Sequence, residues 1–207
     1  MAIIVIGGHS RSVGKTSVVA GLIAALPEFD WTAVKITQYG HGICSANGEA
    51  CDCETVDRCW AILEEQDRSG ESDTSRFLLA GARRSLWVRT EQGRLSEAMP
   101  ALRGKIADAR NVILESNSVL KFLQPDLYLT VLDPATKDFK ASALEFLERA
   151  DGVILHEMTA EPTRQAASLK AASERPIFRV VPPIYVTPQI ITFVRSTLTA
   201  PTVSTRN

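Results

Sequence analysis

The chain has 207 residues, of which 45% are hydrophobic, enough for one α/β domain with a buried core and too few for two domains joined by a linker. We therefore expect a single domain over residues 1–198 and a flexible tail at 199–207. The 23 basic and 24 acidic residues leave a formal net charge of -1, which argues against nucleic acid or an anionic membrane as partner and favours a small molecule.

Apolar, β-branched runs alternate with helical stretches along the chain. Strands are predicted at 2–6, 32–36, 85–89, 111–115, 127–132, 152–156 and 177–181. Helices are predicted at 15–26, 55–66, 74–82, 94–109, 138–149, 162–173 and 188–198. This alternation predicts a doubly wound α/β fold, with a mainly parallel sheet of about seven strands and helices on both faces. The polar, glycine-containing segment 38–73 breaks the alternation and is interpreted as an insert over the ligand site.

The apolar runs are too short for targeting or membrane insertion. The first run, residues 2–6, has no basic segment before it and passes directly into glycines, unlike a signal peptide. No run approaches the length of about 18 residues that spans a bilayer. We therefore expect a cytoplasmic protein with no membrane partner, in which the four cysteines are reduced.

The first predicted strand leads through a glycine-containing loop into a helix, with the sequence GGHSRSVGKTS at residues 7–17. In this context loop amides and the helix N-terminus bind phosphate oxygens, Lys15 reaches the β and γ phosphates, and the Thr16 hydroxyl binds Mg²⁺. A chance Gly-Lys-Thr at a helix start is disfavoured because strand, loop and helix are all present. The predicted residues of this nucleoside triphosphate site are Gly8, Ser10, Arg11, Ser12, Val13, Gly14, Lys15, Thr16 and Ser17.

Four features of the sequence resemble one branch of P-loop NTPases. The loop has five residues between its outer glycines, one more than the Walker pattern, and is similar to the loop of dethiobiotin synthetases and of the MobB family of molybdopterin-guanine dinucleotide biosynthesis proteins. Lys35 matches a lysine that faces the site in that branch. The stretch SDTSRFLLAGA at 72–82 is similar to the MobB pattern of Asp-Ser/Thr, Arg and Ala-Gly-Ala. Glu115 lies at the branch's site glutamate, followed here by Ser116-Asn117-Ser118 where the branch has a glycine.

Three charged residues are candidates for catalysis and Mg²⁺ binding beside Lys15 and Thr16. Glu115 ends a buried predicted strand, so it is either a site carboxylate or a strand end turned to solvent. Asp73 is either a Mg²⁺ ligand or the N-cap of the helix predicted at 74–82. Lys35 either stabilises charge on a transferring phosphoryl group or on a carboxylate substrate, or is a solvated strand end.

All four cysteines, Cys44, Cys51, Cys53 and Cys59, lie within sixteen residues of the predicted insert. Their spacing is not that of a zinc ribbon, which uses paired Cys-x-x-Cys sequences. Thiolates nevertheless suit zinc or an iron–sulfur cluster, and His41 is a substitute ligand. The alternatives are redox-active thiols or unrelated core and surface cysteines.

These observations leave three functional hypotheses. The first, implied by the MobB resemblance, is a homodimeric GTP- or ATP-binding protein with weak Mg²⁺-dependent hydrolysis, acting with a partner in molybdenum-cofactor or other metallocofactor assembly. The second is an ATP-dependent ligase or kinase of the dethiobiotin synthetase type. The third is a nucleotide-binding metal or redox sensor. The sequence does not distinguish GTP from ATP, because residues 156–159 read His-Glu-Met-Thr where guanine-reading proteins have Asn-Lys-x-Asp.

Overall fold

A computed structural model describes residues 1–10, 12–40, 59–135, 145–157 and 175–200. These residues contain one eight-stranded sheet in the order β3-β4-β2-β5-β1-β6-β7-β8. The strands are β1 (Ala2–Gly8), β2 (Trp31–Tyr39), β3 (Trp60–Glu64), β4 (Arg84–Glu91), β5 (Asn111–Glu115), β6 (Leu127–Leu132), β7 (Gly152–His156) and β8 (Ile177–Val180). All neighbouring strands are parallel except the edge strand β3, which is antiparallel to β4. The predicted mainly parallel sheet is therefore confirmed, with one strand more than expected.

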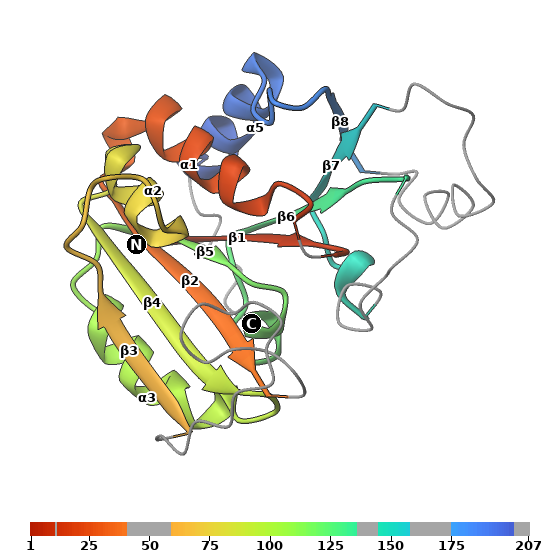
Figure 1. Cartoon of the computed structure of the whole chain (residues 1–207). Helices are drawn as coiled ribbons and strands as arrows, with labels where there is room; N and C mark the ends of the chain where they lie inside the picture. The colour runs from red at the N-terminus through yellow and green to blue at the C-terminus, as the bar shows by residue number, and fades with distance from the viewer. Residues whose placement is uncertain (11, 41–58, 136–144, 158–174, 201–207) are drawn as a thin grey trace, which may run out of the picture.

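Helices cover both faces of this sheet, as predicted (Figure 1). They are α1 (Lys15–Ala25), α2 (Asp73–Leu79), α3 (Leu95–Ile106) and α5 (Pro188–Thr199), with 3-10 turns at Pro27–Phe29 and Ser118–Lys121. Apolar side chains of α1, α2 and α5 pack with one face of the strands, and those of α3 pack with the opposite face. In β1, for example, Ile4 and Ile6 join the first cluster and Val5 joins the second. Burial on both faces explains why the strands read as continuous apolar runs.

The helix predicted at 55–66 is wrong over Trp60–Glu64, which forms the edge strand β3. Ala, Leu and Glu in this segment are good helix formers, which is why the sequence favours a helix. In the structure, however, Ile62 lies opposite Val88 of β4, and Trp60 and Ile62 pack against the α3 side of the sheet. Pairing with β4 and the packing of Trp60 and Ile62 on one face therefore override the local helix propensity.

The remaining predicted elements are only partly described. Of the helix predicted at 138–149, residues 145–147 are helical and those before 145 lie outside the described residues, as does the helix predicted at 162–173. The last seven residues of the predicted tail, 201–207, also lie outside them. In the predicted insert, β2 runs on to Tyr39, and residues 41–58 are not described. Within the described residues, no helix has both the length and the apolar character needed to cross a membrane.

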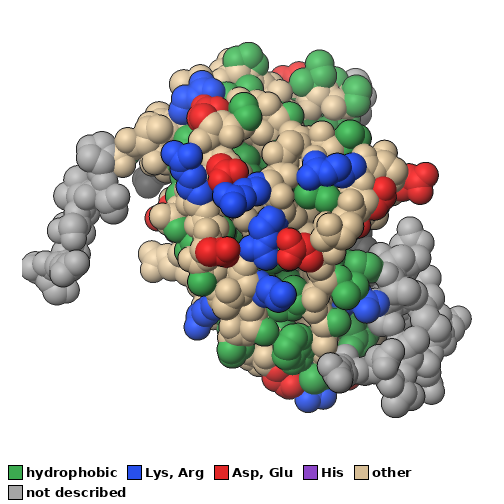
Figure 2. Space-filling model, turned by 90° about the vertical axis from the view of Figure 1, so that its left-hand side faces the viewer, with side chains coloured by type: hydrophobic (Ala, Val, Ile, Leu, Met, Phe, Trp, Pro, Cys, Tyr) green, Lys and Arg blue, Asp and Glu red, His purple; other side chains and the backbone are tan. Residues whose placement is uncertain are grey.

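Acidic and basic side chains are intermixed on the side of the molecule that carries the β3 edge (Figure 2). On this face the described Lys and Arg side chains lie beside Asp and Glu side chains, and Arg84 pairs with Glu64 and Asp108. This surface therefore has the balance of charge that a net charge of -1 predicts.

Candidate functional site

The loop between β1 and α1 has the geometry of an anion-binding loop. Gly14 is the N-cap residue of α1, with a φ of 91° that favours glycine, and its carbonyl accepts from Val18 N at 3.0 Å. A Cβ at Gly14 would also lie 2.1 Å from Cε1 of Tyr185, in the segment between β8 and α5. Among the described residues the N-cap Gly14 makes no side-chain capping bond, and the first turn of α1 has no acidic residue. A helix N-terminus of this kind suits an anionic ligand.

Lys15 and Thr16 begin α1 at the end of this loop. The Lys15 ammonium donates to the Ser10 carbonyl at 2.7 Å, so its side chain folds back across the loop. Ser10 and Val13 are buried, and Ser12 has a positive φ of 55°. The predicted site residue Arg11 lies outside the described residues.

The Glu115 carboxylate lies beside the loop helix and is not turned to solvent. Glu115 ends β5, between Ile6 of β1 and Lys35 of β2, and its side chain is 7% exposed. Its Oε2 accepts from the Thr16 hydroxyl at 2.7 Å. The interpretation of Glu115 as a strand end turned to solvent is therefore wrong, and its role as a site carboxylate stays a prediction.

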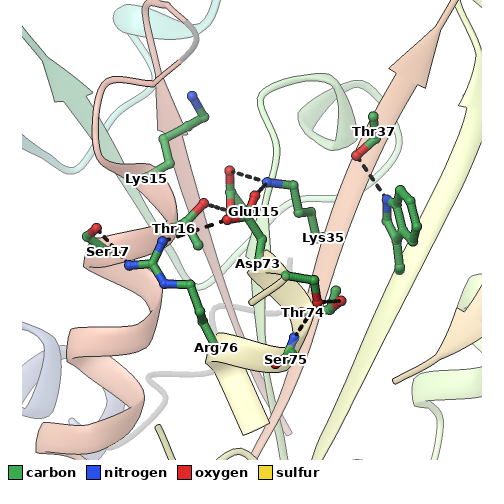
Figure 3. Close-up of polar contacts among 12 residues, drawn as sticks. Lys15, Thr16, Ser17, Lys35, Thr37, Asp73, Thr74, Ser75, Arg76 and Glu115 are labelled. Carbon is green, nitrogen blue, oxygen red and sulfur yellow. Dashed lines mark hydrogen bonds and ion pairs between the residues drawn. The ribbon is translucent and has the colours of Figure 1, made fainter. Parts of the chain in front are cut away.

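Lys35 lies between two carboxylates, in the middle of β2 and opposite the last residue of β5 (Figure 3). Its ammonium pairs with Asp73 Oδ2 and lies 3.4 Å from Glu115 Oε1. Burial of the ammonium lowers its pKa, but the charges of Glu115 and Asp73 outweigh burial, so the pKa of Lys35 is raised above its ordinary value. Lys35 is therefore held in its charged form inside the site, and the solvated strand end is the wrong interpretation.

Asp73 is the first residue of α2 and not its N-cap. The N-cap is Ser72, whose Oγ accepts from Ser75 N at 3.0 Å. In the next turn, Arg76 donates to the hydroxyl of Ser17 at 3.2 Å and lies 3.8 Å from Asp73 Oδ1. The N-cap interpretation of Asp73 is thus wrong, and α2 places Asp73 beside Lys35 and Arg76 beside Ser17 of α1.

The oxygen atoms gathered here suit Mg²⁺. A protein usually offers this ion one hydroxyl and one or two carboxylates, and water and substrate phosphates complete an octahedral shell. Thr16 contacts Glu115, and Glu115 and Asp73 both contact Lys35, so the residues present include such donors. Among the described residues, no group of three or more His, Cys, Asp and Glu side chains is placed to hold a metal by itself. The chain's ligands fit an ion that is bound mainly through a phosphate ligand.

The predicted cysteine cluster falls largely outside the described residues, as do Cys44, Cys51, Cys53 and His41. Cys59 is half-buried, and its Sγ donates to Glu97 Oε2 at 3.1 Å. That hydrogen bond raises the pKa of the Cys59 thiol, which disfavours the thiolate form. Zinc or iron–sulfur binding by the four cysteines stays a prediction.

Two residues near the loop had no role assigned from the sequence. Asn117, two residues beyond Glu115, makes two hydrogen bonds to the backbone of Gly8, and Tyr185 packs on Gly14. The ring centroid of Tyr185 lies 5.5 Å from that of His156, whose pKa is lowered by burial. The adjacent glycines at 7 and 8 are the only sequence signal for a close approach of Asn117, and no signal identifies Tyr185.

No protein-family model and no curated protein sequence matches the chain. Among solved structures it is similar to HypB from Helicobacter pylori in complex with nickel, at 14% identity and a TM-score of 0.48, over 95% of this chain and 85% of that one. It is also similar to a MobB homolog from Bacillus stearothermophilus, at 14% identity and a TM-score of 0.45, over 96% and 99%. For LpxK from Aquifex aeolicus in complex with ATP the values are 18% and 0.49, over 86% of this chain and 53% of that one. At these identities the similarity is one of fold.

Proposed function

We propose that this chain binds a nucleoside triphosphate at the loop of residues 8–17 and hydrolyses it slowly with Mg²⁺. The observation that carries this proposal is the 2.7 Å hydrogen bond from the Thr16 hydroxyl to Glu115. It joins the first turn of the loop helix to a buried carboxylate, at the edge of a parallel sheet where ligands of this fold class bind. Few arrangements other than a cation-assisted phosphate site account for a hydroxyl, a buried carboxylate and an uncapped helix N-terminus at one point.

Each side chain has a defined role in this proposal. The loop amides and Lys15 bind the phosphates, while Thr16 and Glu115 hold Mg²⁺ directly or through water. Bound there, Mg²⁺ neutralises phosphate charge and orients the phosphoryl group. Asp73 acts with Glu115 on the same side of the site.

Lys35 supplies positive charge where the phosphoryl group leaves. In the ligand-free protein its ammonium offsets Asp73 and Glu115. With a triphosphate and its cation bound, those carboxylates gain another positive partner, and the Lys35 charge becomes available to the γ-phosphate oxygens.

We extend the proposal to the MobB-like role, a homodimeric protein that couples binding of GTP or ATP to molybdenum-cofactor or other metallocofactor assembly with a protein partner. What supports it is the position of the MobB-like stretch at 72–82. Asp73 of that stretch contacts Lys35, and Arg76 contacts Ser17 of the loop. The residues that carry the resemblance thus contact Ser17 and Lys35, which belong to the proposed site.

The test is Glu115→Gln, which keeps the size of the side chain and removes its charge. We expect Mg²⁺-dependent phosphate release from GTP or ATP to fall about 100-fold, while affinity for the nucleotide changes much less, because Glu115 acts on the cation and not on the phosphates. Glu64→Gln, at the surface ion pair with Arg84, is the matched control and should hydrolyse like the wild type. A wild-type protein that binds neither nucleotide, or a Glu115→Gln variant of unchanged turnover, would refute the proposal.

A further inference from the structure

Asn117 is bonded to both backbone polar groups of Gly8, where the phosphate loop begins. Gly8 N donates to Asn117 Oδ1 at 3.0 Å, and Asn117 Nδ2 donates to the Gly8 carbonyl at 2.8 Å. Asn117 lies in the short connection between β5 and the 3-10 turn at Ser118–Lys121. One side chain therefore satisfies both groups of the residue from which the loop departs.

The sheet explains why an amide is needed there. The parallel pairing of β1 with β5 ends at Ile6 and Glu115, and Ser116 N makes one further bond to the Ile6 carbonyl at 3.2 Å. Beyond it the chain turns into the 3-10 helix, so Gly8 has no further residue of β5 to pair with. A carboxamide offers the same donor and acceptor as a peptide group, and Asn117 takes the place of the missing strand residue.

The contact is close enough to restrict its neighbours. A Cβ at Gly7 would lie 2.1 Å from Asn117 Oδ1, so residue 7 must be glycine for Asn117 to reach Gly8. On its other side, Ser118 Oγ accepts from Gln38 Nε2 at 2.5 Å, which ties the same connection to β2. Asn117 thus contacts β1 directly, and its neighbour Ser118 contacts β2.

The segment 115–117 holds both ends of the phosphate loop. Asn117 binds Gly8 at the start of the loop, and Glu115 binds Thr16 at its end. Since one residue separates Glu115 from Asn117, the backbone fixes these two contacts relative to each other. Donors aimed at a phosphate are most effective when their positions are set before the ligand arrives.

We propose that Asn117 is a positioning residue that sets the phosphate loop relative to the Glu115 carboxylate. This inference rests on the proposed function for its kinetic consequence, but the ordering of the loop is a property of the ligand-free protein. Without Asn117, the loop amides and Thr16 are no longer held in one register with Glu115. Turnover then falls more than overall stability accounts for.

Asn111 provides a matched control at the opposite end of β5. Its Oδ1 accepts from Ala2 N at 2.9 Å and its Nδ2 donates to the Phe29 carbonyl at 2.7 Å. Asn111→Ala and Asn117→Ala therefore each remove two hydrogen bonds between a carboxamide and the backbone, so we expect similar losses of thermal stability. Only Asn117 is next to the phosphate loop.

The experiment compares these two variants with the wild type by amide hydrogen exchange without nucleotide, and by steady-state hydrolysis of GTP and ATP with Mg²⁺. In Asn117→Ala the Gly8 amide should exchange about tenfold faster, and kcat should fall about tenfold with a smaller change in KM. Asn111→Ala should leave loop exchange and kcat unchanged. Asn117→Asp, which has the same shape and keeps the acceptor, tests the donor to the Gly8 carbonyl should the alanine variant not fold, and should also lower kcat.

The outcomes separate this inference from the proposed function. Unchanged Gly8 exchange in the Asn117 variants overturns the inference whether or not the protein hydrolyses nucleotides. Equal losses of kcat in Asn111→Ala and Asn117→Ala also overturn it, since the effect would then be general stability. The third outcome is that the Asn117 variants show faster Gly8 exchange but the wild-type protein binds no nucleotide. It would support the positioning role of Asn117 and refute the proposed function.

Discussion

Two cations on adjacent strands of this sheet each lie between two carboxylates. Lys35, in the middle of β2 and opposite the last residue of β5, lies between Asp73 and Glu115. Arg84, at the amino end of β4, pairs with Glu64 Oε1 at 2.9 Å and Asp108 Oδ1 at 3.3 Å. The two clusters have the same charges and belong to paired strands, yet their surroundings differ.

The difference lies in what else each cluster contacts. Arg84 also donates to the Lys105 carbonyl, and its partner Asp108 is 82% exposed, so one carboxylate of this cluster is open to solvent. At the Lys35 cluster, Glu115 is 7% exposed and accepts from a hydroxyl of the loop helix. We therefore expect the Arg84 cluster to serve stability and the Lys35 cluster, beside the carboxyl end of β5, to surround the proposed ligand position.

Lys15→Ala should have the largest effect, and it tests whether the loop beside the Lys35 cluster binds phosphate. The Lys15 ammonium donates to the Ser10 carbonyl in the ligand-free protein, and we expect it to donate to the phosphates when the nucleotide binds. Losing a charged hydrogen-bond donor to them should weaken affinity for the triphosphate by about 100-fold. Titration with a fluorescent nucleotide measures this loss, with Lys105→Ala on the exposed side of α3 as the control. Equal affinities of the two variants would end the phosphate-loop interpretation.

Lys35→Met and Arg84→Met test whether the two clusters differ in function, because each variant removes the central cation of one cluster. We expect Lys35→Met to lower turnover about 100-fold, since it removes positive charge from the phosphoryl group. Arg84→Met should keep wild-type turnover and lose less than about 1 kcal/mol of stability in urea unfolding, as surface ion pairs do. Hydrolysis and unfolding should be measured on both variants. A turnover defect in Arg84→Met as large as that in Lys35→Met would show that the clusters do not differ in function.

Alkaline pH should affect the stability contributed by the two clusters differently, and this is the smallest of the expected effects. The pKa of Lys35 is raised in the folded protein, so its contribution to stability is complete below its ordinary pKa of 10.5 and is lost as the pH rises through the folded-state value. The hydrogen bond to Glu64 raises the pKa of Arg84, which stays charged throughout. Urea unfolding at increasing pH above 10.5 should therefore show a loss of stability in the wild type and in Arg84→Met that is smaller in Lys35→Met. Parallel curves for all three proteins would contradict this assignment.

Strands buried on both faces could be predicted from the sequence because they require uninterrupted apolar residues. β5, β6 and β7 have the predicted bounds, and α1 differs from its predicted range by one residue. β3 could not be predicted, since its Ala, Leu and Glu residues favour a helix and only pairing with β4 makes them a strand. Continuous burial thus leaves a signal in the sequence, whereas a half-covered edge strand depends on its neighbour.

The candidate site residues also differ in how well the sequence predicts them. Lys15, Thr16, Lys35 and Glu115 could be proposed because each lies in a recognisable strand or directly after a recognisable loop. Asn117 could not be assigned a role, because its hydrogen bonds depend on where the pairing of β1 with β5 stops. Chemistry carried by a motif is visible in one sequence, whereas support from a neighbouring connection needs the register of the sheet.

The contact of Tyr185 with Gly14 limits how far this protein can be shortened. The phosphate-binding residues lie within the first 17 positions, yet Tyr185 packs on Gly14, and Val186 lies 2.7 Å from where a Cβ of Gly21 would be. Ile190 of α5 belongs to the same buried cluster as the apolar residues of α1. A fragment that ends after β8 would leave one side of the loop helix open to water. The proposed nucleotide site therefore cannot be transferred as an N-terminal fragment, because residues near the C-terminal helix α5 pack against its loop and helix.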